Sequence, residues 1–292
     1  MLLNKTKIVV FDMDETLGYF VELGIFWDSL HNYARSINAD TKGIFTQEYF
    51  NSVLDIFPEF IRPNILAMLQ FVKMKKITRQ CQSVMIYTNN QGPKEWTYFI
   101  KNYFDHKLKY KLFNHVISAF KANGKQIEFC RTSHDKTIKD FMRCSKMREN
   151  IEICYLDDTY YPGMNTDEVY YIKIKPYVYD LDFDSMIERF IKSHASKKLI
   201  SDKDDKKETE TEREKEKSFS EFMKANMNNY EFAYIEKNKE EYEIDKIVAK
   251  KTMNHLHFFF NKNKKGVSPP RSSGNRKTLK NRVYKSKTKK NR

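Results

Sequence analysis

The amino-acid sequence predicts an α/β protein with a Rossmann-like, doubly wound parallel sheet, and two observations lead to this prediction. Strand-like apolar runs alternate with amphipathic, helix-like stretches through residues 1–198, which is typical of a parallel sheet with crossover helices. The first strand-like run also ends at two carboxylates, at the position where open α/β sheets bind ligands. The sequence therefore predicts a functional site at the carboxyl end of the sheet.

Five segments are predicted strands because short runs of β-branched and other apolar residues are bounded by polar ones. They cover residues 7–11, 83–87, 115–118, 152–156 and 169–174. Amphipathic stretches predict helices over residues 63–75, 94–103, 136–144 and 184–194. Helix-like segments also lie between Gly18 and Thr88, where they could form a small cap or part of the core.

The net charge of +14 arises almost wholly at the C-terminal end of this 292-residue chain. Residues 261–292 contain thirteen lysines and arginines and no acidic residue, which leaves 40 basic and 39 acidic residues elsewhere. Blocks of this kind are usually disordered and bind nucleic acid, other polyanions or import factors. We expect a disordered basic tail that binds such a partner independently of the folded domain.

Between the domain and this tail, two further segments differ in composition. Residues 199–217 are dense in Lys, Glu, Asp and Thr, which predicts a charged linker. Residues 218–260 regain aromatic residues and could hold one or two helices, without an apolar stripe long enough for a separate core. The predicted organisation is therefore a domain over 1–198, a linker over 199–217, a helical segment over 218–260 and the tail.

The sequence contains no evident signal peptide and no run of about 20 apolar residues that could span a membrane. Its cysteines are widely spaced and show no zinc-like pattern; they are Cys81, Cys130, Cys144 and Cys154. We expect reduced thiols in an intracellular protein, cytoplasmic or nuclear, with no membrane partner. The pair His255 and His257 is expected to make surface or partner contacts rather than to bind a metal.

Polar side chains that suit phosphoryl transfer follow the predicted strands. Asp12 and Asp14 follow the first strand, Thr88 and Asn89 the second, and Asp157 and Asp158 the fourth. A carboxylate can attack phosphorus, a second acid can protonate the leaving oxygen, and Mg²⁺ with a lysine can neutralise the charge. The lysine comes from the stretch 136–141, Lys-Thr-Ile-Lys-Asp-Phe.

These motifs resemble the haloacid dehalogenase superfamily of Mg²⁺-dependent aspartyl phosphatases. The sequence Asp12-Met13-Asp14-Glu15-Thr16-Leu17 is similar to the D-x-D-E-T-L motif of one branch, the NLI-interacting-factor-like RNA polymerase C-terminal-domain phosphatases. Arg62-Pro63 resembles its R-P-G element, Lys139-Asp140-Phe141 its K-D-L element, and Asp157-Asp158 its closing acid pair. The resemblance covers residues 7–194 and implies a haloacid-dehalogenase-like fold with a small cap or none.

The resemblance also implies a role for each matching residue. Asp12 is the expected nucleophile and a Mg²⁺ ligand, and Asp14 is the expected general acid and base, with its main-chain carbonyl on the metal. Thr88 is expected to bind the phosphoryl oxygens, helped by the backbone near Asn89, and Lys139 to neutralise charge. Asp157 and Asp158 complete the metal site, with Asp158 as the expected direct ligand. A phosphoserine or phosphothreonine protein is the expected substrate.

Several alternatives stay open at the level of sequence. Thr88 and Asn89 could cap the following helix, and Lys136 could replace Lys139 as the site lysine. The aromatic residues within 18–28 could form a flap that holds a proline-containing peptide, or they could belong to the core. The resemblance also departs from the branch, since Asn89 and the stretch Thr159-Tyr160-Tyr161 are not typical of it. Two rival functions remain: a phosphatase of nucleic-acid ends, and a non-catalytic scaffold that binds nucleic acid. The sequence does not predict the oligomeric state.

Overall fold

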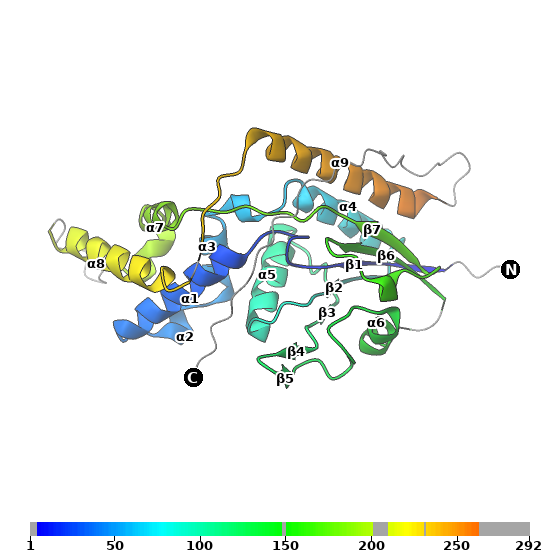
Figure 1. Cartoon of the computed structure of the whole chain (residues 1–292), viewed down its shortest axis with the longest axis horizontal. Coiled ribbons are helices and arrows are strands. Elements are labelled where there is room, and N and C mark those ends of the chain that lie inside the picture. Colours follow the sequence, from blue (N-terminus) through cyan, green and yellow to red (C-terminus); the bar gives the residue numbers. More distant parts are fainter. Residues whose placement is uncertain (1–4, 148–149, 201–209, 231, 263–292) are drawn as a thin grey trace.

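The computed structural model describes residues 5–147, 150–200, 210–230 and 232–262. Except for its first two residues, the predicted basic tail lies outside these described residues. A five-stranded sheet forms the centre, and its strands are ordered β3-β2-β1-β6-β7 (Figure 1). Every pair of neighbouring strands is parallel, as predicted. The strands are β1 (Thr6–Phe11), β2 (Ser83–Tyr87), β3 (His115–Ile117), β6 (Ile151–Asp157) and β7 (Val169–Lys173).

The predicted strands are confirmed, with each end displaced by no more than one residue. The first strand, β1, lies in the middle because its apolar side chains are buried on both faces, which a central parallel strand requires. Its last residue, Phe11, is in register with Ile86 of β2 and Leu156 of β6. The residues that follow these three strands therefore emerge together at one edge of the sheet.

Apolar layers cover both faces of the sheet. On one face, Val9 and Phe11 belong to the larger core, which includes side chains of α4 (Ile65–Ile77) and α5 (Lys94–Lys107). On the other face, Ile8 and Val10 pack in a smaller core with α6 (Ile138–Ser145). Crossover helices on opposite faces make the sheet doubly wound.

A group of helices lies beyond the carboxyl ends of the strands (Figure 1). It contains α1 (Val21–Ser36), α2 (Thr41–Ile44), α3 (Gln47–Leu54), α7 (Phe183–Ile191) and α8 (Glu210–Met227). The aromatic residues that could have formed an exposed flap are Tyr19, Phe20, Phe26 and Trp27, and all four are buried. The flap interpretation is therefore wrong for these residues. They belong to the core because α1 is amphipathic and packs its apolar side against α7 and α8.

The two C-terminal helices pack on the domain rather than apart from it. The rings of Phe219 in α8 and Tyr33 in α1 lie 4.8 Å apart, centroid to centroid. Helix α9 (Lys239–Asn261) begins with a capping box formed by Asn238 and Glu241. It lies along α4 and β7, and the hydroxyl of Tyr170 is 2.7 Å from His255 Nδ1. Helix α8 begins at Glu210, within the segment 199–217 that was expected to be a linker. The charged residues from Glu210 onward in that segment are therefore helical.

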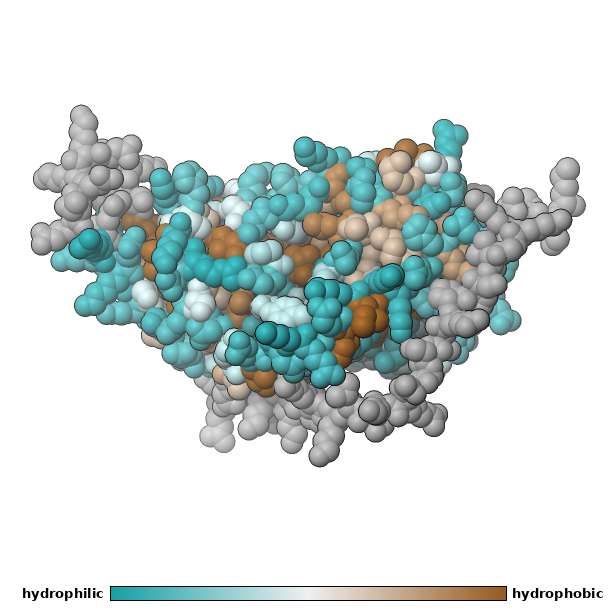
Figure 2. Space-filling view, turned by 90° about the horizontal axis from the view of Figure 1, so that it is seen from above, coloured by the Kyte–Doolittle hydropathy of each residue, from teal (hydrophilic) through white to brown (hydrophobic). Residues whose placement is uncertain are grey.

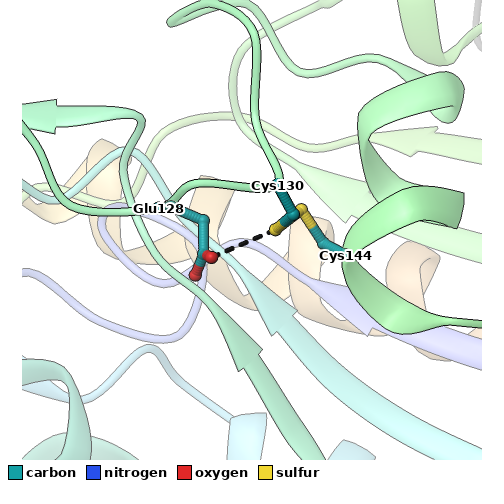
Figure 3. Close-up of side chains that lie close together, drawn as sticks. All are labelled: Glu128, Cys130 and Cys144. Atoms are coloured by element: carbon teal, nitrogen blue, oxygen red, sulfur yellow. Dashed lines mark hydrogen bonds between the residues drawn. A yellow bond between two sulfur atoms is a disulfide. The ribbon is translucent and has the colours of Figure 1, made fainter.

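The cysteines differ from their prediction. Cys130 and Cys144 form a disulfide (Figure 3). Cys81 and Cys154 are buried free thiols. The prediction of reduced thiols throughout is wrong for the first pair because α6 returns Cys144 to a Cα–Cα distance of 5.0 Å from Cys130. That proximity follows from tertiary structure, which a separation of 14 residues does not reveal.

Three short 3₁₀ helices complete the main elements: η1 (Pro58–Phe60), η2 (Pro162–Met164) and η3 (His194–Lys198). A two-stranded antiparallel hairpin, β4 (Lys121–Ala122) with β5 (Lys125–Gln126), lies outside the main sheet. Within the described ranges, none of the helices combines the length and apolar character that a membrane span requires. Hydrophilic and apolar residues are interspersed on the face seen in Figure 2.

Candidate active site

The predicted site residues gather where β1, β2 and β6 end. Asp12 follows β1, Thr88 follows β2, and Asp157 is the last residue of β6. The Asp12 amide donates a hydrogen bond to the Leu156 carbonyl (2.8 Å), which continues the ladder between β1 and β6. Because the ladder extends to this point, the sheet itself fixes the backbone that carries the two acidic side chains.

Lys136 bridges these two carboxylates. Its Nζ lies 2.6 Å from Asp12 Oδ1 and 2.7 Å from Asp157 Oδ2, and only 1% of its side chain is exposed. Burial by itself lowers the pKa of Lys136, but the two carboxylates outweigh burial and raise it. The lysine is therefore held as a cation beside Asp12.

The prediction of Lys139 as the site lysine is wrong. Lys139 lies in the first turn of α6, is exposed, and makes no ion pair with any described residue. Lys136 precedes Thr137, whose hydroxyl accepts a hydrogen bond from the Asp140 amide and caps α6. The chain enters the helix past the site, so the last residue before the cap reaches the carboxylates and the first turn of the helix does not.

The carboxylates of Asp157 and Asp158 differ in the number and length of the hydrogen bonds that they accept. Asp157 Oδ2 accepts bonds from Lys136 and from the Tyr155 hydroxyl, and Asp157 Oδ1 accepts one from the Thr159 amide (2.8 Å). From side chains of the described residues, Asp158 accepts longer bonds, from the hydroxyls of Thr16 (3.4 Å) and Thr159 (3.3 Å). Asp158 therefore has more freedom to bind another group.

Asp12, Asp157 and Asp158 form a cluster suited to a cation. Each contributes a carboxylate oxygen, and these oxygens all lie within 4.8 Å of one another. Burial, followed by the charge of Asp157, raises the pKa of Asp158 to about 6. Three acids facing one lysine leave excess negative charge, and an all-oxygen donor set fits a hard cation such as Mg²⁺.

Asp12 and Asp14 have raised pKa values for partly different reasons. Burial raises the pKa of Asp12 to about 7, against the charge of Lys136, which lowers it. Burial and the nearby charge of Asp12 raise the pKa of Asp14 to about 7. Asp14 also accepts a 3.0 Å hydrogen bond from Asn90 Nδ2. A carboxyl group with a pKa near 7 can both donate and accept a proton near neutral pH.

Thr88 and Asn89 form the turn beside Asp14. Thr88 is fully buried, and its hydroxyl accepts a 3.0 Å bond from the Asn90 amide. The Asn89 side chain is already occupied, since it donates to the Tyr161 hydroxyl (2.9 Å) and accepts from Arg131 (2.8 Å). The Asn89 side chain therefore connects neighbouring loops. The backbone of Asn89 remains for contacts within the site.

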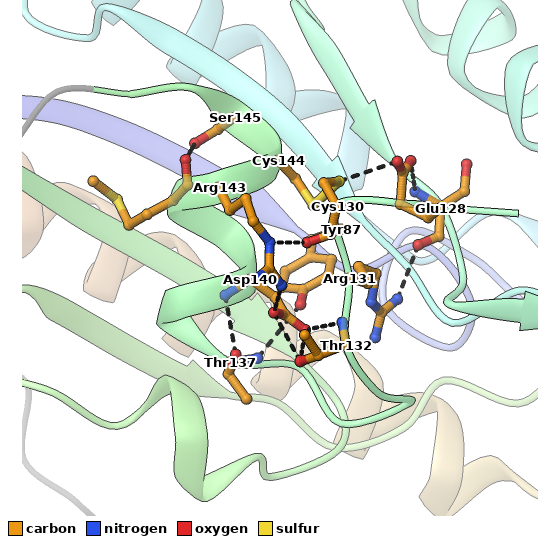
Figure 4. The surroundings of a disulfide bond; sticks show 12 residues. Tyr87, Glu128, Cys130, Arg131, Thr132, Thr137, Asp140, Arg143, Cys144 and Ser145 are labelled. Carbon is orange, nitrogen blue, oxygen red and sulfur yellow. Dashed lines mark hydrogen bonds and ion pairs between the residues drawn. A yellow bond between two sulfur atoms is a disulfide. The ribbon is translucent and has the colours of Figure 1, made fainter. Parts of the chain in front are cut away.

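Arg131 was not predicted from the sequence and holds this turn from behind. Its guanidinium donates to the carbonyl oxygens of Thr88 (3.0 Å) and Ser118 (2.9 Å), and it lies over the ring of Tyr87. The neighbouring residue Cys130 is fixed to α6 by the disulfide, and Thr132 bonds to Asp140 (Figure 4). The segment that carries Arg131 and Lys136 is therefore anchored at several points.

The chain turns sharply after Asp14. Glu15 has a positive φ of 55°, and its amide donates to the Gly18 carbonyl (2.7 Å). A Cβ on Gly18 would lie 2.4 Å from the Phe60 carbonyl oxygen, so this position requires glycine. Arg62, which the resemblance singled out, donates to the Thr16 carbonyl (2.7 Å) and to the Glu15 carbonyl, and thereby stabilises the turn.

Comparison of the chain with protein-family models, with curated proteins and with solved structures found no match. The assignment of a function therefore depends on the chemistry of the residues at the end of the sheet.

Proposed function

We propose that this protein is a Mg²⁺-dependent aspartyl phosphatase that hydrolyses phosphate monoesters. The observation that carries the proposal is Lys136 between Asp12 and Asp157, with Asp158 and Asp14 close by at the end of the sheet. This arrangement supports the haloacid-dehalogenase-like fold and roles that the sequence resemblance implies, with Lys136 in the role expected of Lys139.

In the proposed reaction, a carboxylate oxygen of Asp12 attacks phosphorus, and the bond from phosphorus to the leaving oxygen breaks. The Asp14 carboxyl gives its proton to that oxygen, so a neutral alcohol leaves and Asp12 carries the phosphoryl group. The Asp14 carboxylate then takes a proton from water, whose oxygen attacks phosphorus and frees phosphate and Asp12.

The other residues neutralise and orient charge. Lys136 would offset the charge of the phosphoryl oxygens, and Thr88 with the backbone around Asn89 would contact them. Asp12, Asp157 and Asp158, together with the Asp14 carbonyl, would hold Mg²⁺. When bound, Mg²⁺ would supply positive charge that lowers the repulsion between the phosphate and the attacking carboxylate.

The alternatives have less support. A non-catalytic scaffold would not require a lysine and two acids, Asp12 and Asp157, buried together at the cost of desolvation. A phosphatase of nucleic-acid ends would draw its support from the basic tail, which lies outside the described residues. The expected phosphoserine or phosphothreonine substrate depends on the resemblance alone.

The test is Mg²⁺-dependent release of phosphate from an aryl phosphate by the full chain. Asp12→Asn removes the attacking charge at constant shape, and we expect turnover to fall by several orders of magnitude. Asp167→Asn is the matched control, because Asp167 is exposed and precedes β7, at the opposite end of the sheet from the site. Turnover above a tenth of wild type in Asp12→Asn, or full activity after exhaustive chelation, would falsify the proposal.

A further inference from the structure

A cavity of about 630 Å³ opens beside Asp14, where α1 and α5 face each other. Asp14 and Asn90, which share a hydrogen bond, both line it. Small-molecule sites typically enclose about 300–1,000 Å³. The cavity is therefore large enough for a ligand and begins at the residue proposed to protonate the leaving oxygen.

Aromatic rings form the wall of this cavity, contributed by Phe20, Trp27, Phe45, Trp96 and Phe99. Three of them pack together: the ring centroid of Trp27 lies 5.1 Å from that of Phe45 and 5.6 Å from that of Phe99. Such mutual packing fixes the rings before a ligand arrives, which lowers the entropic cost of binding. A rigid aromatic wall favours a flat, apolar occupant.

A glycine lines the cavity beside Trp96. Gly24 lies within α1, and a Cβ at this position would be 3.7 Å from the Trp96 ring. Glycine inside a helix costs about 1 kcal/mol relative to alanine. A larger side chain at position 24 would project toward Trp96 and fill the space between α1 and α5.

The charges around the cavity do not favour a polyanion. Asp14, Asp28 and Glu95 line it together with a single arginine, Arg35. His31, which also lines the cavity, is neutral at pH 7, because burial lowers its pKa to about 4 and Arg35 adds to the effect. There is no surplus of positive charge to hold a second phosphate or a nucleic-acid backbone.

We propose that this cavity binds the leaving group of the phosphate ester, and that this group is an uncharged, flat aromatic system larger than one ring on a free small molecule. The size follows from volume, since a cavity of about 150 Å³ already holds benzene. The inference rests on the phosphatase activity proposed above and names its substrate class.

The kinetic test compares 2-naphthyl phosphate with methyl phosphate. We expect wild type to prefer the naphthyl ester in kcat/KM, and Gly24→Leu to reduce that preference at least tenfold by filling the cavity. Ser36→Leu is the matched control, because it adds the same side chain to an exposed position of α1 that does not line the cavity. An unchanged preference in a folded Gly24→Leu protein would overturn the inference. So would a preference for a phosphotyrosine peptide over 2-naphthyl phosphate.

A binding test measures occupancy of the cavity independently of catalysis. The chain has two tryptophans, and both line the cavity, so tryptophan emission reports its occupancy. We expect 2-naphthol, which carries no phosphate, to quench this emission saturably in wild type and Ser36→Leu, but not in Gly24→Leu. Absence of saturable quenching in wild type would overturn the inference even if phosphate esters are hydrolysed. If no phosphate ester is hydrolysed, the proposed function fails and the leaving-group assignment fails with it.

Discussion

Lys136 Nζ lies almost equally close to Asp12 Oδ1 (2.6 Å) and Asp157 Oδ2 (2.7 Å), and thereby joins the ends of β1 and β6. The position of Lys136 matters for both stability and electrostatics. It offsets the repulsion between two buried acids of neighbouring strands, and it places a cation beside the carboxylate proposed to attack phosphorus.

Removing this cation should therefore affect folding and activity together. We expect Lys136→Met to lower the free energy of unfolding by about 3–5 kcal/mol, as when one partner of a buried ion pair is lost, and to abolish phosphatase turnover. Lys139→Met is the matched control at an exposed position, with an expected change within about 0.5 kcal/mol. Urea unfolding and aryl phosphate hydrolysis measure the two effects. Loss of activity in Lys139→Met with Lys136→Met still active would reverse the assignment.

The two acids at the end of β6 should differ in role, Asp158 in Mg²⁺ binding and Asp157 in stability. Asp158→Asn should raise the Mg²⁺ concentration needed for half-maximal rate, because its weakly bonded carboxylate is the freer ligand. Asp157→Asn should instead lower the melting temperature, because that carboxylate accepts bonds from Lys136, Tyr155 and the Thr159 amide. Binding of Mg²⁺ to the folded state should raise the melting temperature of wild type, and Asp158→Asn should weaken this rise. An unchanged Mg²⁺ requirement in Asp158→Asn would shift the direct ligand to Asp157.

The sheet was predictable because its signal is local. The predicted strands differ from β1, β2, β3, β6 and β7 by at most one residue at each end, since each is a short apolar run. The gathering of Asp12, Thr88 and Asp157 followed as well, because parallel strands bring their carboxyl ends to the same edge. These predictions need only the order of strand-like and helix-like segments along the chain. They do not depend on how the side chains pack.

The remaining features depend on contacts between distant segments. The choice between Lys136 and Lys139 depended on where α6 begins, and Thr137 as its cap was the local signal that could have decided it. The role of Arg131 has no such signal, because its partners include Thr88, 43 residues earlier in the chain. The disulfide and the packing of α8 on α1 likewise follow from tertiary structure.

The disulfide between Cys130 and Cys144 should stabilise the segment that carries Arg131 and Lys136. The closed loop is short, with a sequence separation of 14, so we expect Cys130→Ser/Cys144→Ser to lose about 2–4 kcal/mol. Reduction of the wild type should cause a similar loss, whereas the double variant should not respond to a reducing agent. Equal denaturation midpoints of wild type with and without reductant would contradict this prediction, and peptide mapping without reduction would show whether the bond is present.

Stability should also depend on Glu22, a buried carboxyl group in the first turn of α1. Burial raises its pKa to about 9, and the nearby charge of Asp180 adds to the effect. The folded state therefore keeps a proton that the unfolded chain releases near its ordinary pKa of 4.5. The resulting stabilisation is fully present below pH 4.5 and is lost as the pH rises through about 9.

Glu22→Gln removes this titration while it retains a neutral polar side chain of similar shape. We expect the free energy of unfolding of wild type to fall relative to that of Glu22→Gln between pH 5 and 9, by at most about 1.4 kcal/mol per pH unit. The interval from pH 8 to 9 is the most informative, because it lies above the raised pKa values of Asp12 and Asp14 (about 7) and of Asp158 (about 6). Glu240→Gln, at an exposed position in α9, is the control and should follow the wild-type pH dependence. Free energies of unfolding are obtained from urea unfolding curves at each pH. If they change with pH in the same way for wild type and Glu22→Gln across this interval, Glu22 is ionised in the folded protein. A cation near Asp180 would then have to compensate its charge.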